Sequence, residues 1–267
     1  RRMPVLSATL NVMVGAVRKA ARQVRRDFNE VEQLQVSRKG AADFVTQSDV
    51  ATEKVLREEL TKARPDFGFV LEEGGTIAGK DSEHRWHIDP IDGTTNFIHG
   101  VPHFCISVGL ERAGTVIAGV IYNPVTDELY HAERGKGAFL NDRRLRVSAR
   151  RDMAESLFAT GLNLGPTGNP PMFFAQYAAI TKVSAGIRRF GSAALDLAYV
   201  AAGRYEGFWE IGLKSWDTAA GIVMVREAGG QVSDMAGGGD VLGNAGIVAG
   251  NQEIHPQLLR ALKAVKA

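Results

Sequence analysis

The chain has 267 residues, of which 45% are hydrophobic and 23% charged, and it has no apolar stretch of about 18 residues, so we expect a globular protein with a sizeable core and no membrane-spanning helix. The 32 basic and 30 acidic side chains give a formal net charge of +2, which argues against a membrane-surface protein and against nucleic acid as the main partner, while small anionic substrates remain possible. Because Cys105 is the only cysteine, no intramolecular disulfide and no cysteine-based zinc site can form, and a reducing compartment, the cytoplasm, is expected.

The first predicted element is a long amphipathic helix over residues 4–28, in which apolar side chains recur at steps of three or four. Four basic residues fall on its opposite face: Arg18, Arg22, Arg25 and Arg26. A solvated helix face is the commoner interpretation of such a pattern, and an anion or RNA patch is the alternative.

A second helix is expected over residues 49–63, where Pro65 ends it and Val50, Leu56 and Leu60 face inward. Short apolar runs of strand type follow, each leading directly into acidic residues: 67–71 and 86–88. Four further runs, separated by turn residues, predict an antiparallel meander: 106–110, 116–122, 128–131 and 138–140.

After about residue 150, strands and helices alternate. The expected strands are 157–160, 207–211 and 247–249, and the expected helices are 171–183, 193–202, 217–228 and 255–265. Helices, then a meander, then strand–helix units predict stacked layers of helices and sheets, an α/β (α+β) fold. We expect one compact unit of two packed halves: residues 1–150, with a helix pair and an antiparallel sheet, and residues 151–267, an α/β half.

The segment from Trp86 to Asn96 places two carboxylates, Asp89 and Asp92, at the end of an apolar strand. Pro90 favours an extended Asp89, and Gly93 permits a tight turn directly after Asp92. Carboxylate oxygens suit a hard divalent cation, and backbone N–H groups after the glycine suit a phosphate. An Asx turn with solvated aspartates is the alternative.

Further acids lie at other strand ends and helix starts: Glu72, Glu73, Glu210, Asp49 and Asp217. Each has an ordinary explanation as a polar strand end or a helix cap. Such termini gather at one edge of layered α/β folds, however, and carboxylates packed there would repel one another. A pair of divalent cations removes that repulsion, so the acids together predict a metal site.

Four histidines lie near the first acidic motif: His84, His87, His99 and His103. They could suggest zinc, but no His-x-x-x-His pair with the glutamate of a zinc protease is present. We interpret them as surface or supporting side chains.

Two segments carry a family resemblance: Asp89-Pro90-Ile91-Asp92-Gly93-Thr94-Thr95-Asn96-Phe97 and Trp216-Asp217-Thr218-Ala219-Ala220-Gly221, with Glu72-Glu73 upstream of both. In this order they resemble the inositol monophosphatase family, and the resemblance covers nearly the whole chain. It implies alternating α-β-α-β-α layers, a homodimer, Mg²⁺ dependence and sensitivity to lithium. The first half would carry most of the metal ligands, and the second would carry Asp217 and the substrate contacts.

Residue by residue, the resemblance implies the following roles. One magnesium would be held by Glu72, Asp89 and the Ile91 carbonyl, a second by Asp89, Asp92 and Asp217, and a third, weaker ion by Glu72. The catalytic groups would be Thr94, Asp49 and Glu72, of which Thr94 and Asp49 orient or deprotonate the attacking water. The substrate would meet Asp92, Gly93, Thr94, Gly191, Ser192, Ala193 and Glu210. Lys39 and Glu73 would have secondary roles.

The implied reaction is Mg²⁺-dependent hydrolysis of a small polyol or sugar phosphate monoester, with inositol 1-phosphate as the first candidate. Alternatives with the same metal core are a fructose-bisphosphatase-like enzyme, a 3′-phosphonucleotidase and a histidinol phosphatase. A regulatory protein that binds RNA or the transcription machinery is the alternative from another class. Departures from the family pattern at Gly74-Gly75, Gly161 and Asn163 leave the substrate open.

Overall fold

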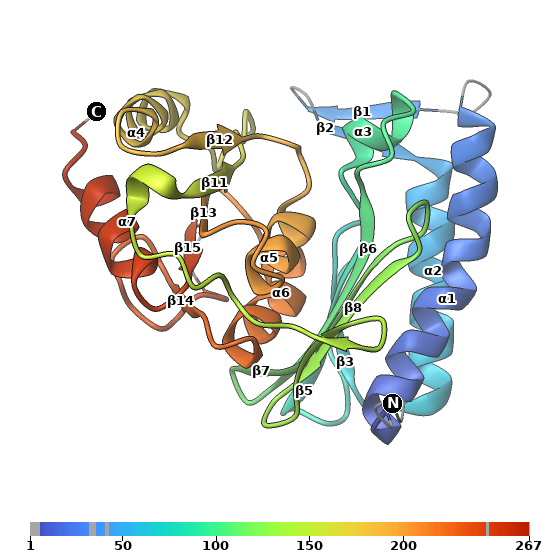
Figure 1. The fold of residues 1–267 in the computed structure, drawn as a ribbon. Coiled ribbons are helices and arrows are strands. Elements are labelled where there is room, and N and C mark those ends of the chain that lie inside the picture. Colours follow the sequence, from blue (N-terminus) through green and yellow to red (C-terminus); the bar gives the residue numbers. More distant parts are fainter. Residues whose placement is uncertain (1–5, 32–35, 41–42, 244–245, 267) are drawn as a thin grey trace.

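Two β-sheets alternate with three layers of helices, which is the α-β-α-β-α arrangement that the resemblance implies (Figure 1). This computed structural model describes residues 6–31, 36–40, 43–243 and 246–266, and of residues 36–40, 43 and 44 it describes only the backbone. The fold class is therefore confirmed as a layered mixture of helices and sheets. None of the helices within these ranges is long and apolar enough to cross a membrane.

The described residues form seven α-helices: α1 (Ala8–Asn29), α2 (Gln47–Ala63), α3 (Thr94–Ile98), α4 (Pro170–Thr181), α5 (Ala193–Ala201), α6 (Ser215–Glu227) and α7 (Ile254–Lys263). α1 begins where the Ser7 side chain accepts a hydrogen bond from the Leu10 N–H at 3.1 Å. α2 begins with a capping box between Thr46 and Asp49. α1 and α2 pack on each other and cover one face of the larger sheet.

The larger sheet has eight strands in the order β10-β9-β8-β7-β6-β5-β3-β4. Their bounds are β3 (Gly68–Leu71), β4 (Gly75–Ile77), β5 (His84–Asp92), β6 (Cys105–Arg112), β7 (Thr115–Asn123), β8 (Glu128–Glu133), β9 (Gly137–Leu140) and β10 (Arg143–Arg144). β3 and β5 are parallel, and the other neighbours are antiparallel. The predicted meander forms β6 to β9.

The smaller sheet has the order β12-β11-β13-β15-β14. Its strands are β11 (Leu157–Thr160), β12 (Gly186–Arg188), β13 (Gly207–Ile211), β14 (Gln231–Ser233) and β15 (Gly246–Gly250). β11 runs parallel to β12 and β13, and the other pairs are antiparallel. A hairpin of β1 (Val36–Gly40) and β2 (Asp43–Thr46) stands apart from both sheets, and a short 3₁₀ helix covers Met153–Glu155.

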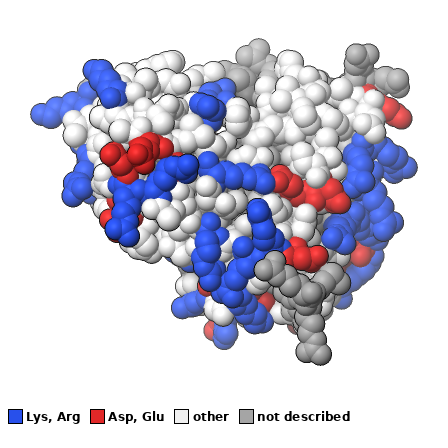
Figure 2. All heavy atoms as spheres, viewed as in Figure 1, with Lys and Arg blue, Asp and Glu red and all other residues white. Residues whose placement is uncertain are grey.

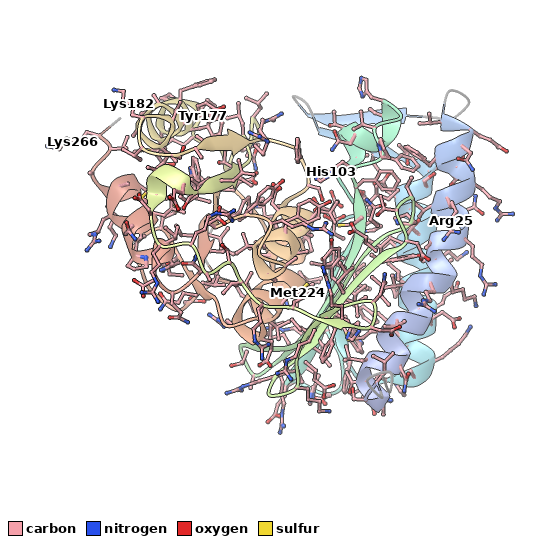
Figure 3. All side chains as sticks on the ribbon, in the orientation of Figure 1. Arg25, His103, Tyr177, Lys182, Met224 and Lys266 are labelled. Atoms are coloured by element: carbon pink, nitrogen blue, oxygen red, sulfur yellow. The ribbon has the colours of Figure 1, made fainter. Side chains whose placement is uncertain are left out.

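The central helical layer, α5 and α6, lies between the two sheets, and Met224 of α6 is fully buried there (Figure 3). α6 approaches the larger sheet closely because β6 offers a glycine: a Cβ on Gly109 would lie 2.6 Å from the Ala219 Cβ. α6 thus joins the second half of the chain to the sheet of the first half. The division at residue 150 stays a prediction.

The four strands that the sequence did not predict in the two sheets are the edge strands β4, β10, β12 and β14. Each has two or three residues, too few for an alternating pattern, and short edges are a common protection against sheet-to-sheet association.

The inward orientation predicted for Val50 is wrong: its side chain is 55% exposed. The inward stripe of α2 instead begins with Asp49, Thr52 and Glu53 and becomes apolar only at Leu56. A helix turns about 100° per residue, which places the buried positions 48, 49, 52, 53, 56 and 60 on one side and Val50 outside that arc. Polar side chains occupy the buried positions at this end because it lines the site described below.

Candidate active site

A bulge at the end of β5 brings the two predicted aspartates together. Asp89 lies opposite Ser107 of β6 and Asp92 lies opposite Cys105, so three steps along β5 match two along β6. Side chains three apart on a regular strand point to opposite faces, and one extra residue restores the same face. Pro90, which has no N–H for the ladder, lies inside this bulge.

Asp217 of α6 completes an acidic cluster with Asp89 and Asp92. Each of the three side chains offers a carboxylate oxygen, and these oxygens lie within 4.8 Å of one another. Asp89 is only 3% exposed, and its Oδ1 has no hydrogen-bond partner among the described residues. A buried carboxylate oxygen without a partner is costly, so this cluster calls for a positively charged ligand.

Neighbouring groups hold the other oxygens of the cluster in place. The Oδ2 of Asp92 accepts hydrogen bonds from the Ser192 hydroxyl at 2.6 Å and from the Ala194 N–H at 2.7 Å. The Oδ2 of Asp217 accepts from the Lys214 N–H at 2.6 Å, at the start of α6. Because one oxygen of each carboxylate is held by these N–H and O–H donors, the orientation of both side chains is set.

The pKa values of the cluster are raised, as expected for buried acids that face one another. Burial is the main cause for Asp89, whose pKa lies well above its ordinary value, and the charges of Glu72, Asp92 and Asp217 add to it. Burial and the Asp92 charge raise the pKa of Asp217 to about 7. Burial also raises the pKa of Asp92, against the hydrogen bonds from Ser192 and Ala194.

Asp49 and Thr94 meet beside this cluster. The Thr94 hydroxyl lies 3.2 Å from Asp49 Oδ1 and 3.0 Å from the Ile91 carbonyl oxygen. The Oδ2 of Asp49 accepts hydrogen bonds from the Thr46 N–H at 2.8 Å and the Thr46 hydroxyl at 2.5 Å. Asp49 is fully buried, and burial raises its pKa. The predicted threonine–aspartate pair is therefore in contact, and Ile91 contributes its carbonyl at the same place.

The Glu72-Glu73 pair follows β3 and leads into the turn to β4. Glu72 is partly exposed, and its charge contributes to the raised pKa of Asp89. The Glu73 N–H donates to Glu53 of α2 at 2.8 Å, a contact that sequence analysis missed. The structure explains why position 74 is a glycine: a Cβ there would lie 2.9 Å from both Glu53 Oε1 and Leu71 Cδ1. The glycine lets the turn pack against α2.

The backbone at Gly93 forms the other side of the site. Gly93 has φ +101°, in the left-handed region, and a Cβ there would lie 3.2 Å from the Gly191 carbonyl. Asn96 donates from its Nδ2 to the His103 and Phe190 carbonyls, each at 2.7 Å. Two segments far apart in sequence, the turn after Asp92 and the segment before α5, are therefore held side by side. Asn96 was part of the predicted motif but had no assigned role.

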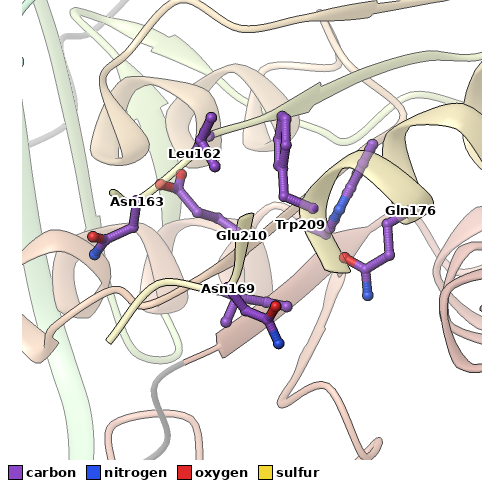
Figure 4. Close-up of a pocket in the computed structure, with 9 residues that line it drawn as sticks. Leu162, Asn163, Asn169, Gln176, Trp209 and Glu210 are labelled. Atoms are coloured by element: carbon purple, nitrogen blue, oxygen red, sulfur yellow. The ribbon is translucent and has the colours of Figure 1, made fainter. Parts of the chain in front are cut away.

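Glu210 lies at the end of β13, and burial together with the Asp217 and Asp92 charges raises its pKa to about 8. Gly161 makes room for it, since a Cβ on that glycine would lie 2.1 Å from Glu210 Oε2. A small cavity beside Glu210 is lined by residues that include Asn163, Gln176 and Trp209 (Figure 4). Its volume of about 10 Å³ suffices for at most one water, so a sugar-sized group does not fit inside it.

Asp196 of α5 is a further buried acid that sequence analysis missed. It is 1% exposed, its Oδ1 has no partner in the described chain, and burial with the Glu210 and Asp92 charges raises its pKa well above the ordinary value. The available signal was one acid inside an otherwise apolar helix, Ala193–Ala201.

The remaining predicted residues are placed as follows. Ser192 caps α5 and Ala193 is its first helical residue, beside Asp92. Lys39 lies in β1, but its side chain is outside the described part of the chain. Among the histidines, His103 packs against the rings of Phe190 and Tyr199, and none belongs to a possible metal group within the described residues.

The donor set fits a hard divalent cation such as Mg²⁺. The cluster supplies carboxylate oxygens only, with the Ile91 carbonyl nearby, and magnesium binds through a few such oxygens plus water and phosphate. A cation would offset the repulsion that raises these pKa values and would bind the Asp89 oxygen that has no partner among the described residues.

Known proteins match the chain over nearly its full length. The model of the inositol monophosphatase family matches residues 5–267. An inositol-1-monophosphatase of Mesorhizobium japonicum is 54% identical, covering 96% of this chain and 97% of that protein. A protein of Pasteurella multocida named Nus factor SuhB is 42% identical, covering 97% of each. The crystal structure of extragenic suppressor protein suhB from Bartonella henselae superposes with a TM-score of 0.92 at 55% identity, covering 96% of this chain and 99% of that one. The chain belongs to the inositol monophosphatase family.

Proposed function

We propose that this phosphoric monoester hydrolase uses Mg²⁺ to hydrolyse inositol 1-phosphate to inositol and phosphate. One observation carries the proposal: Asp89, Asp92 and Asp217 place carboxylate oxygens within 4.8 Å of one another, at a buried position. Carboxylates gathered out of water repel one another unless they are protonated, and a cation removes that repulsion while they stay ionised; the family relatives supply the reaction class.

The metal ligands are proposed as the resemblance implies. Glu72, Asp89 and the Ile91 carbonyl would hold one Mg²⁺, Asp89, Asp92 and Asp217 a second, and Glu72 a third, weaker ion. When bound, such ions lower the pKa of water and neutralise charge on the phosphate and the leaving oxygen. Asp89 belongs to both proposed sites and is the most buried of the three clustered acids, so its loss should matter most.

Thr94 and Asp49 would orient the attacking water and take its proton. The Thr94 hydroxyl can donate to Asp49 Oδ1 while its own oxygen accepts from water. Asp49 is suited to receive the proton because burial raises its pKa above that of an exposed aspartate. The N–H groups of Gly93 and Thr94 would bind the phosphate oxygens.

The leaving alcohol would meet Asp92, Glu210 and the segment Gly191–Ala193. The Ser192 hydroxyl already donates to Asp92, so its contribution is to hold that carboxylate toward the substrate. Glu210, with a pKa of about 8, can carry a proton at neutral pH and donate to a substrate hydroxyl. A polyol with several hydroxyl groups satisfies these carboxyl groups better than a monohydroxy ester does.

The test is phosphate release from inositol 1-phosphate with and without MgCl₂. We expect rapid release only with Mg²⁺. Slow release, together with faster turnover of fructose bisphosphate, histidinol phosphate or a 3′-phosphonucleotide, would support the reaction class and refute inositol 1-phosphate as the substrate. No release from any of the four, in protein that binds Mg²⁺, would overturn the catalytic proposal.

Three further properties belong to the proposal: a homodimer, a cytoplasmic location and inhibition by Li⁺ through competition at the Asp92 and Asp217 carboxylates. Lithium inhibition would be measured as turnover at rising LiCl with equal NaCl as the control. Equal turnover in the two salts would contradict it.

A second candidate function, RNA binding, is favoured by an arginine groove on α1. The groove is lined by Arg18, Arg22, Arg25, Arg26, Asn29, Tyr122 and Asp127 and has a volume of about 560 Å³. Basic side chains gather over this edge of the molecule in Figure 2, and Arg25 is labelled in Figure 3. None of the four guanidinium groups forms an ion pair with a described carboxylate. By contrast, Arg150, in the arginine-rich stretch of residues 143–151, pairs with Glu206 at 3.1 Å. A row of arginines without an ion pair to a described carboxylate suits a phosphate backbone.

RNA binding would be measured by fluorescence anisotropy with a short single-stranded RNA at low and high salt. We expect binding that weakens with salt, that is lost in the double variant Arg18→Glu/Arg22→Glu and that persists in Asp89→Asn. Binding that is independent of salt, or unaffected by the double variant, would reject the groove as the site.

A further inference from the structure

His87 links the strand that carries Asp89 to the helix that carries Asp217. It lies in β5, is 3% exposed, and uses both ring nitrogens. Its Nδ1 lies 2.9 Å from the hydroxyl of Ser215, the first residue of α6, and its Nε2 lies 2.8 Å from Glu111 Oε2. Ser215 is 128 positions away in sequence, so this contact spans the two sides of the site.

Glu111 of β6 anchors the imidazole from the other side. Its Oε1 accepts hydrogen bonds from Arg85 Nη2 and from the Gly114 N–H, each at 2.9 Å. Burial opposes its ionisation, but the hydrogen bonds from Arg85 and His87 lower the pKa of Glu111. Since an ionised carboxylate can only accept, Nε2 of His87 carries the hydrogen.

The ring of His87 is therefore held in one orientation. With the Nε2 hydrogen directed at Glu111, Nδ1 is left to pair with the Ser215 hydroxyl. A neutral ring with its hydrogen on Nε2 accepts at Nδ1 from that hydroxyl. The chain Arg85–Glu111–His87–Ser215 is continuous, and each group in it has a partner.

α6 packs against β5, β6 and β7 of the larger sheet. Ala219 lies against Gly109 and Ala220 against Gly119, where a Cβ on either glycine would clash with the helix. Those contacts lie a full turn beyond Ser215. The first turn holds Asp217, and its carboxylate is bound to its own helix start through the Lys214 N–H. His87 supplies a hydrogen bond from the first residue of this turn to β5.

We propose that His87 is a positioning residue that sets the Asp217 carboxylate relative to Asp89. His87 and Asp89 are two residues apart on β5, so their side chains point to the same face. β5 thus carries Asp89 and, through His87, contacts the helix that carries Asp217. The inference rests on the proposed cation site, since the distance between these acids matters through the ion they share.

The chain offers a matched control in a second buried histidine–serine pair. His255 Nε2 lies 3.0 Å from the Ser233 hydroxyl, and His255 and Ser233 are 6% and 5% exposed. His255 lies in α7 and has no described hydrogen bond to the acidic cluster. Its removal costs a similar hydrogen bond and leaves a similar cavity, but away from the site.

The experiment measures Mg²⁺ affinity by calorimetry and by the Mg²⁺-dependent shift in melting temperature, for the wild type, His87→Ala, Ser215→Ala, their double variant and His255→Ala. We expect both single variants to weaken Mg²⁺ binding about tenfold, because a partner that orients a ligand is worth about 10- to 100-fold in metal affinity. The double variant should be no weaker than His87→Ala, because the two side chains form one link. His255→Ala should lose stability and keep its Mg²⁺ affinity.

Three outcomes would overturn the inference. Unchanged Mg²⁺ affinity in Ser215→Ala, a variant too small to disturb the fold, would show that the link does not position Asp217. Equal weakening in His255→Ala would show a general loss of stability. Additive effects in the double variant would show that the two residues act separately. Absence of Mg²⁺ binding in the wild type would instead refute the proposed function.

Discussion

Two regions of this molecule concentrate like charges, and they do so under opposite conditions. The acidic cluster of Asp89, Asp92 and Asp217 is largely enclosed, and its pKa values are raised. The arginine groove on α1 is formed by exposed guanidinium groups. Water and salt screen charges at the surface but not in the interior. The comparison teaches that a buried acidic cluster stays ionised only with a ligand of opposite charge, whereas an exposed basic cluster is charged with or without one.

The largest effect is expected from removing one charge of the enclosed cluster. Asp89→Asn should lower turnover by about 10³-fold or more, because it removes charge that holds the ions supplying several kcal/mol of transition-state stabilisation. The metal-free variant should melt at the same temperature as the metal-free wild type or higher, because one buried repulsive charge is gone. Phosphate release and thermal unfolding measure the two effects.

An exposed aspartate provides the control for this prediction. Asp142, in the turn between β9 and β10, lies outside the cluster, and Asp142→Asn should leave both quantities unchanged. An Asp89→Asn enzyme with near-normal turnover would refute the assignment of the metal site.

The second prediction concerns pH. Asp217 and Glu210 have pKa values of about 7 and about 8 in the folded chain, against ordinary values of 3.8 and 4.5. Folding therefore favours their protonated forms, and this stability is fully present below the ordinary values and is lost as the pH rises through the folded ones. The metal-free protein should lose stability between about pH 4 and about pH 8. Mg²⁺, which binds the ionised forms, should stabilise it more at about pH 8 than at about pH 5.5.

This dependence is measured by thermal unfolding with EDTA and with MgCl₂ across that pH range. Metal-free protein that becomes more stable with rising pH over the window would contradict the raised pKa values, and with them the premise of an enclosed cluster.

A smaller effect is expected at Gly161. Because a Cβ there would lie 2.1 Å from Glu210 Oε2, Gly161→Ala should displace that carboxyl group. The KM for inositol 1-phosphate should rise about tenfold, while Mg²⁺ affinity stays the same, since Glu210 is proposed to meet the substrate and not the metal.

Gly15 of α1 is the matched control for the glycine substitution. A Cβ there meets nothing within 4 Å, so Gly15→Ala should leave KM unchanged and stabilise the helix by about 0.5–1 kcal/mol. An unchanged KM in Gly161→Ala would remove Glu210 from the proposed substrate contacts.

The smallest effect is expected in the arginine groove. Arg18→Ala/Arg22→Ala should change the free energy of unfolding by no more than about 0.5 kcal/mol, because exposed charges repel weakly through water. Urea unfolding at low and high salt measures this. If the double variant were more stable than the wild type by more than about 1 kcal/mol, and salt removed the difference, the guanidinium groups would repel one another strongly, as the buried carboxylates do. The contrast between the two regions would then be wrong.

Much of the fold followed from local pattern. The long helix of α1, the meander of β6 to β9 and the strand–helix alternation of the second half all agree with the periodicity of apolar residues, with boundaries within a few residues. The edge strands were missed because two or three residues carry no period. Val50 was misplaced because the buried face of α2 is polar where it meets the site.

The sequence by itself determined the family, through two acidic motifs in a fixed order, and so the layered fold and the class of reaction. Only the tertiary structure decided which groups meet: the bulge at Pro90 that turns Asp89 and Asp92 to one face, Gly161 beneath Glu210, and His87 against Ser215. The buried Asp196 likewise looks, in sequence, like one polar residue in an apolar helix. The physical reason is that periodicity reports which face of an element is buried, whereas a bulge depends on the neighbouring strand and contacts between distant segments depend on how the layers pack, which is set by the whole chain.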